Sequence, residues 1–176
     1  MNKFFGMALL LAGMMLAVGT GANFRYYEAS RDITVDIVGD DNEFIDLTPL
    51  QPYAILSNGK LVIDFSANNP NYPGYGDGMS PNTTYVFEEV FEVSNELWEN
   101  EDGDYPICVT ISAVHPNIQI FAGDYDSPIA GPGSSISVTV YHGSPVPIGF
   151  IFDNTNAALG SYQFQLQIDA VAGACQ

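Results

Sequence analysis

Apolar and polar residues alternate one by one in several separate stretches of the chain, and this pattern constrains the fold more than any other feature. Successive side chains of a β-strand point to opposite faces, so strict alternation predicts strands that are buried on one face. The strands expected on this basis cover residues 33–37, 61–65, 107–113, 118–120, 135–140, 146–152 and 162–170. About nine or ten short strands with frequent turn signals predict an all-β sandwich, with a partly open barrel as the alternative.

Helical periodicity is almost absent, and turn residues separate the expected strands. Residues 93–101 are the best candidate for a helix, which would have one or two turns. The pair Asn58-Gly59 lies between two apolar runs and predicts a tight hairpin, because both central positions of such a turn need positive φ. Residues 66–82 contain three prolines and three glycines, which predicts a long irregular loop with either a binding role or an ordinary packing role.

The N-terminus has the layout of a secretory signal peptide over residues 1–22. A short basic start precedes the apolar run 4–18, and small residues follow, with Thr20 and Ala22 suitably placed for cleavage before Asn23. A retained transmembrane anchor is the main alternative, although a spanning helix needs about 20 apolar residues. Cleavage predicts an extracellular or cell-surface protein that has no contact with the membrane afterwards.

Two kinds of covalent modification are expected in an exported chain. Cys108 and Cys175 are the only cysteines, and an oxidising compartment favours a disulfide between them over two free thiols. This bridge would tie the C-terminus to a central strand. The only N-glycosylation sequon begins at Asn82, and its position in the long loop makes Asn82 a candidate glycan site.

The chain is strongly acidic, with a formal net charge of −17. A surface of this sign repels nucleic acid and anionic membranes, so neither is expected as a partner. Acidic clusters at residues 40–43, 99–104 and 124–126 offer the hard oxygen ligands that calcium prefers. The clusters match no calcium motif, so solvated carboxylates are the main expectation, structural calcium is the alternative and no other cofactor is expected.

The residues of familiar catalytic motifs are missing. His115 and His142 are the only histidines and lie far apart, which excludes the paired histidines of a zinc-protease helix. No serine has the flanking glycines of a nucleophile elbow. The expectation is therefore a protein without catalytic residues and without a catalytic metal.

The alternation changes phase near the start of the exported chain. Phe24 and Tyr26 are apolar at even positions, whereas the strand expected over 33–37 has its apolar residues at odd positions. One continuous strand cannot bury both sets on one face, so a bulge or hinge is expected near Ala29-Ser30. The preceding residues would then either remain as a bulged first strand or leave the domain and pair with a neighbour's sheet edge. This candidate donor strand comprises Asn23, Phe24, Arg25, Tyr26, Tyr27, Glu28, Ala29 and Ser30.

Several stretches resemble a known group of exported proteins. The similar stretches are residues 19–24, 28–30 and 46–49, then 81–87 and 89–95, and finally 147–150 and 167–170. The first three resemble the signal-peptide junction and first strands of the TasA/camelysin group, and the others resemble a related archaeal family of unknown function. The resemblance implies export through a SipW-type signal peptidase and a jelly-roll-like antiparallel β-sandwich. For TasA-like proteins and archaeal bundling pili it also implies fibres that assemble by donor-strand exchange.

Three functions follow from these observations. The main expectation is a structural subunit of an extracellular filament or biofilm-matrix fibre, with signal peptide 1–22, donor strand 23–30 and sandwich domain 31–176. Its partners would be copies of itself in a head-to-tail polymer. The alternative is a monomeric surface module that binds glycan or calcium through loop 66–82, with Tyr72 and Tyr75 as contacts. A metalloprotease, which camelysin relatives suggest, is disfavoured by the missing zinc motif.

Overall fold

The computed structural model describes residues 4, 6, 7, 10, 31–97 and 105–176. The chain divides into two units, Met1–Asp36 and Ile37–Gln176. Most of the predicted signal peptide and the whole candidate donor strand 23–30 lie outside the described residues. In the part of the chain that is described, no helix is long and apolar enough to cross a membrane.

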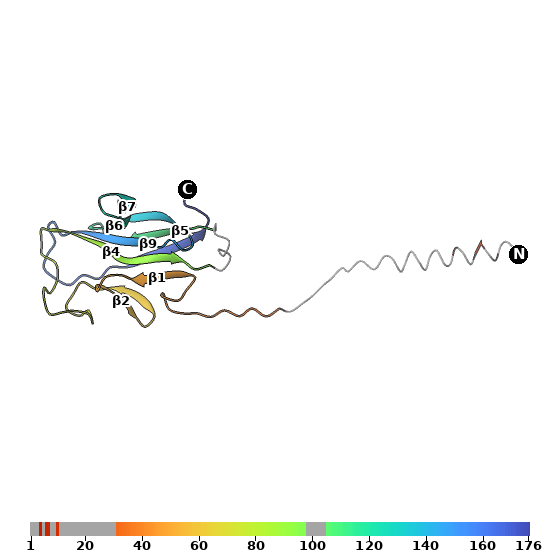
Figure 1. The fold of residues 1–176 in the computed structure, drawn as a ribbon, viewed down its shortest axis with the longest axis horizontal. Helices are drawn as coiled ribbons and strands as arrows, with labels where there is room; N and C mark the ends of the chain where they lie inside the picture. The colour runs from red at the N-terminus through yellow and green to blue at the C-terminus, as the bar shows by residue number, and fades with distance from the viewer. Residues whose placement is uncertain (1–3, 5, 8–9, 11–30, 98–104) are drawn as a thin grey trace. The chain divides into compact units, whose positions relative to one another are not determined.

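The described part of the second unit contains ten strands, which pair in the antiparallel sense (Figure 1). In chain order they are β1 (Ile45–Pro49), β2 (Ala54–Ser57), β3 (Lys60–Ile63), β4 (Thr84–Asn95), β5 (Ile107–Ala113), β6 (Ile118–Gly123), β7 (Pro128–Gly133), β8 (Ser135–Val140), β9 (Val146–Asp153) and β10 (Leu166–Ala172). One sheet has five strands in the order β1-β4-β9-β6-β7, and a second has three in the order β10-β5-β8. The hairpin β2–β3 forms a separate small sheet.

The two larger sheets enclose one apolar core, which confirms the predicted all-β sandwich. The inward residues of β5 are completely or almost completely buried, as are their counterparts in β8, β6 and β9. Alternation in β5 places Val109 and Ile111 inside while Thr110 pairs through its hydroxyl with Ser137 of β8 on the outer face. Burial of the apolar rows of both sheets supplies most of the stabilisation, at about 25 cal/mol per Å² of apolar surface removed from water.

The sandwich is closed along the side where β7 and β8 lie. A single residue, Ser134, separates these two strands, and its carbonyl accepts a hydrogen bond from the Ala113 amide (2.9 Å). Gly131 packs so tightly there that an added Cβ would lie 2.5 Å from the Ile120 carbonyl oxygen. The chain therefore passes directly from one sheet to the other at this side.

The tight hairpin and most strand positions confirm the sequence expectations. Asn58 and Gly59 both have positive φ (52° and 74°) between β2 and β3. Residues 66–82 form a long irregular stretch, as expected. The last strand begins later than the predicted range 162–170, because β10 starts at Leu166 and Phe164 precedes it.

Two element predictions were wrong. Residues 33–37 form no strand, and the first strand of the sandwich is β1. The expected helical turn over 93–101 is contradicted at its start, because β4 continues to Asn95; residues 98–104 lie outside the described part. Asn95 is completely buried and its side-chain amide donates to the carbonyls of Tyr105 and Val140, which holds the end of β4 in the sandwich.

Two features of the fold are not predicted by the alternation of apolar and polar residues in the sequence. Strand β7 is an edge strand with the sequence PIAGPG, and its two prolines and two glycines are not typical of a strand. Strand β4 contains an irregularity between Phe87 and Phe91, where Glu89 has a φ of 50°. The irregularity shifts the phase of the alternation, so that Val90 and Phe91 are both completely buried.

Candidate functional site: an open groove between two sheet edges

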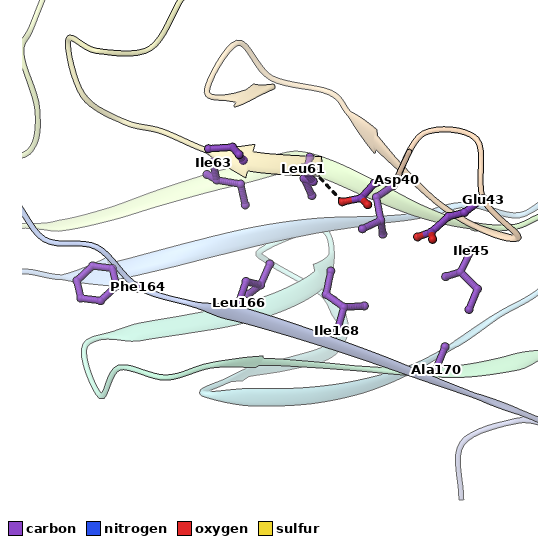
Figure 2. Close-up of a pocket in the computed structure, with 11 residues that line it drawn as sticks. Asp40, Glu43, Ile45, Leu61, Ile63, Phe164, Leu166, Ile168 and Ala170 are labelled. Carbon is purple, nitrogen blue, oxygen red and sulfur yellow. Dashed lines mark hydrogen bonds between the residues drawn. The ribbon is translucent and has the colours of Figure 1, made fainter. Parts of the chain in front are cut away.

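The side of the sandwich opposite β7 and β8 carries an open groove of about 630 Å³. Its walls come from β1, β3 and the preceding turn on one side, and from β10 and the residue segment before it on the other (Figure 2). The groove is lined by Asp40, Glu43, Ile45, Leu47, Leu61, Val62, Ile63, Phe164, Leu166, Ile168 and Ala170. Most of these side chains are apolar, and many are only partly buried although they pack against the core.

The wall formed by β1 and β3 is fixed by one aspartate. The Asp40 amide donates to the Gly59 carbonyl (2.9 Å), and the Asp40 carboxylate accepts from the Leu61 amide (2.8 Å; Figure 2). The Leu47 amide of β1 donates to the Asp40 carbonyl (2.6 Å). Because Leu47 is bonded in this way, part of the outer edge of β1 is already occupied by the chain itself.

Close packing explains why glycine occupies position 39. A Cβ added to Gly39 would lie 3.0 Å from the Gly59 Cα, so the two backbones approach more closely than other residues would allow. The chain is therefore pinned at Gly39 and Asp40 against the β2–β3 turn, at the margin of the groove.

The opposite wall is a sheet edge. Strand β10 pairs with β5 from Leu166↔Ala113 to Ala172↔Ile107, and among the described residues no strand pairs with its other edge. Leu166, Ile168 and Ala170 line the groove, while the residues between them are exposed. Strand β10 thus presents an unused row of backbone hydrogen-bonding groups beside an apolar row, which is the arrangement that accepts an added strand.

The predicted disulfide is confirmed and lies directly behind this edge. Cys108 of β5 and Cys175 are bonded, with their Cα atoms 4.8 Å apart. The Cys175 amide also donates to the Thr139 hydroxyl of β8 (3.0 Å). The C-terminal segment after β10 is therefore fastened to the other two strands of its sheet.

One end of the groove is acidic. Partial burial raises the pKa of Glu43 above its usual value of 4.5, and the neighbouring carboxylates Asp40 and Asp46 raise it further. One carboxylate oxygen of Asp46 is buried and has no hydrogen-bond partner among the described residues, and the other accepts from the Thr48 hydroxyl (3.2 Å). This end of the groove therefore disfavours additional negative charge.

The structure places loop 66–82 away from any strand pairing and orders it internally. The Asn69 side chain is buried and donates to the carbonyls of Pro52 and Asp64. The Tyr72 hydroxyl donates to Asp77 (2.6 Å), which raises the pKa of Tyr72, and Tyr75 is 84% exposed. The Tyr72 hydroxyl is therefore bonded within the loop, whereas Tyr75 projects into solvent.

The remaining candidate residues do not line the groove. Asn82 is exposed, and its side-chain oxygen accepts from the Asn156 amide (3.0 Å). The His115 ring packs on Phe164, with 4.4 Å between ring centroids, whereas His142 lies 2.8 Å from the Asn95 carbonyl. Within residues 31–97 and 105–176, no three histidine, cysteine or acidic side chains gather as ligands for a metal ion. The acidic cluster at 99–104 lies outside the described residues.

The inward rows of β3 and β10 can be predicted from the sequence, but the groove between them cannot. A row such as Leu166, Ile168, Ala170 shows which face points inward, but it does not show whether another strand covers that face. That information depends on the order of strands in the two sheets, for which no local signal exists.

Fold and groove together define an antiparallel β-sandwich domain that is closed along one side and open along the other. The model of a family described as a protein of unknown function (DUF1102) matches residues 37–175, and the chain belongs to this family. A search of curated proteins finds no match. The family match begins at Ile37, the first residue of the second unit, and so covers every strand of the described part of the chain.

Proposed function

We propose that this protein is a structural subunit of an extracellular filament or biofilm-matrix fibre, in which an N-terminal strand of one subunit occupies the groove of the next. The observation that carries the proposal is the open groove between β1 and β10. Half-buried apolar residues beside an unpaired sheet edge are unfavourable in a monomer exposed to water. A strand from a second copy would bury these residues and satisfy the edge.

Other features support an extracellular location. Disulfides persist in oxidising compartments, and the bridge between Cys108 and Cys175 fits such a compartment. The layout of residues 1–22 as a signal peptide and the resemblance to TasA-like proteins support the same location. Membership of DUF1102, a family of unknown function, points to no function of its own.

The geometry of such a contact favours an open chain of subunits. Groove and donor strand are different parts of the same subunit, so the contact is heterologous and each subunit both gives and receives a strand. Contacts of this kind continue head to tail unless the rotation between subunits closes a ring. A filament is therefore the expected product.

The test is electron microscopy and sedimentation of the protein isolated after secretion, together with two matched variants. Ile168→Lys places a charge in the apolar groove, whereas Gln167→Lys adds the same charge to the exposed face of the same strand. We expect fibres from the unchanged protein and from Gln167→Lys, and folded monomers from Ile168→Lys. Monomers from the unchanged protein across a wide concentration range would refute the proposal.

A monomeric binding module is the second candidate, and the exposure of Tyr75 beside the ordered Tyr72–Asp77 pair favours it. An exposed tyrosine on an ordered loop is a common contact for sugars. This function predicts a soluble monomer whose binding to a glycan array is lost in Tyr75→Ala. Glycan binding by monomers without fibres would replace the filament proposal.

A further inference from the structure

We infer that residues 32–38 form the inserted strand, and that this strand adds to the free edge of β10 in a second copy of the chain. Ile33, Val35 and Ile37 would then fill the groove. The inference rests on the proposed function and specifies both the donor segment and the accepting edge. It differs from the sequence-based expectation, which placed the donor at residues 23–30.

The segment has the side-chain pattern of a strand but no strand partner among the described residues of its own chain. Ile33, Val35 and Ile37 are 88%, 75% and 97% exposed, and residues 31–39 form no strand. The residues between them are Thr34 and Asp36, which suit a solvent-facing row. Three large apolar side chains at alternate positions would gain strongly from burial, and only an extended conformation places them on one face.

The accepting edge follows from the hydrogen bonds of the two groove walls. The Leu47 amide of β1 already donates to Asp40, so the outer edge of β1 is partly used. Strand β10 has no strand partner on its outer edge among the described residues. An added strand therefore pairs with β10 through backbone hydrogen bonds and extends the three-stranded sheet to four.

The apolar rows of donor and acceptor have the same length and spacing. Leu166, Ile168 and Ala170 occupy three alternate positions that line the groove, and the donor offers three apolar residues with the same spacing. Neighbouring strands of a sheet place such residues side by side on one face. The donor row would continue the inward face of β10 and cover Ile45 and Leu61, which are only partly buried in the single chain.

The pinned turn at Gly39 and Asp40 favours insertion into a second copy over insertion into the same subunit. Asp40 is held by hydrogen bonds to Gly59, Leu61 and Leu47, which fix the point where the donor segment joins the sandwich. Ile37 belongs to the same unit as the groove, lies two residues before this turn, and is almost completely exposed. Ile37 therefore does not line the groove of its own chain.

The first test changes the two faces of the donor separately in the full chain. The inner variant carries Ile33→Thr, Val35→Thr and Ile37→Thr, and the outer control carries Asp32→Thr and Asp36→Thr. We expect the inner variant to reduce the fibre fraction in a sedimentation assay at least about ten-fold, while the outer control keeps fibres. Both variants should retain the circular dichroism spectrum and thermal midpoint of the folded monomer, because the changed side chains lie outside the core.

The outcomes separate the inference from the proposed function. Fibres from the inner variant as abundant as those from the unchanged protein would overturn the donor assignment and leave the filament proposal standing. Residues 23–30 would then be the donor to examine. Absence of fibres from the unchanged protein would remove the filament proposal itself.

The second test locates the accepting edge by cross-linking. The two native cysteines are bonded to each other, so one introduced cysteine gives a single free thiol. The Val35→Cys variant is to be mixed in turn with each of five variants that carry a single introduced cysteine at one of residues 166 to 170. These five variants differ in mass from Val35→Cys, and each mixture is oxidised mildly. Disulfide dimers are expected with cysteine at 166, 168 or 170 and not at 167 or 169. Cross-links at the odd positions alone, or none at any position in a fibre-forming mixture, would refute β10 addition.

Discussion

The two sides of this sandwich solve the same packing problem in different ways. Along the β7–β8 side the chain passes from one sheet to the other through one residue, and the neighbouring core residues Ile120 and Ile136 are 0% and 5% exposed. Along the β1–β10 side the sheet edges stay apart, and Leu166, Ile168 and Ala170 line an open groove. The apolar face of an alternating strand becomes fully buried only where other strands cover it. On the open side, a strand from a partner can still cover that face.

The largest expected effect concerns the disulfide that fastens the open side. Replacing Cys108 and Cys175 by serine should lower the free energy of unfolding by about 4 kcal/mol, because a bridge across a sequence separation of 67 restricts the unfolded chain. Urea unfolding of the monomer measures this loss. The single changes leave a free thiol, so the double variant is the proper comparison, and an unchanged midpoint would contradict the prediction.

The next effect compares one substitution on both sides. Ile120→Ala on the closed side should lower the free energy of unfolding by about 3 kcal/mol, since it leaves a cavity in a fully packed region. Ile168→Ala should lower it by about 1 kcal/mol in the monomer, because the side chain is only partly buried. Equal losses in denaturant titrations would show that the two sides are packed alike.

The same pair of variants should reverse its order in fibres. We expect Ile168→Ala to raise the critical concentration for assembly several-fold, because the donor loses an apolar contact in the groove. Ile120→Ala should leave the critical concentration close to that of the unchanged protein at temperatures where the monomer stays folded. A larger assembly defect in Ile120→Ala would argue that fibres depend on general stability and not on the groove.

The difference between the two sides also explains what the sequence allowed us to predict. Strand β5 and the Asn58-Gly59 hairpin were predicted correctly because alternation and positive φ are local properties. Residues 33–37 carry the same alternation and were wrongly placed in the sandwich, since alternation specifies an apolar face but not the strand beside it. The groove was not predicted for the same physical reason. Strand β7 was not predicted because its prolines and glycines are not typical of a strand.

Salt should affect the open side more than the closed side. In the inferred assembly Asp32 and Asp36 lie on the outer face of the sheet beside Asp169, in a chain whose net charge is −17. Raising the ionic strength from 0.1 to 1 M shortens the Debye length from about 10 to 3 Å and screens this repulsion. We expect the critical concentration for fibres to fall several-fold over this range, as measured by sedimentation.

A matched variant distinguishes this local repulsion from the effect of net charge. Asp169→Asn removes one carboxylate beside the donor, whereas Asp124→Asn removes one from the exposed segment between β6 and β7. The first should weaken the salt dependence of assembly more than the second. Equal changes would assign the effect to total charge and remove this support for β10 as the accepting edge.

The smallest expected effect concerns the acidic end of the groove. The pKa of Glu43 in the folded chain is raised above 4.5 by burial and by Asp40 and Asp46, so the folded state binds this proton more tightly than the unfolded state. The raised pKa means that Glu43 opposes folding above its folded pKa, and this penalty disappears as the pH falls through that pKa toward 4.5. Glu43→Gln should therefore stabilise the monomer at pH 7 by less than about 1 kcal/mol, because the group is largely solvated.

Insertion of a donor removes more water from Glu43, so the critical concentration for assembly should fall on mild acidification in the unchanged protein and much less in Glu43→Gln. Identical pH profiles of assembly for the two proteins would show that the donor does not reach the end of the groove where Glu43 lies.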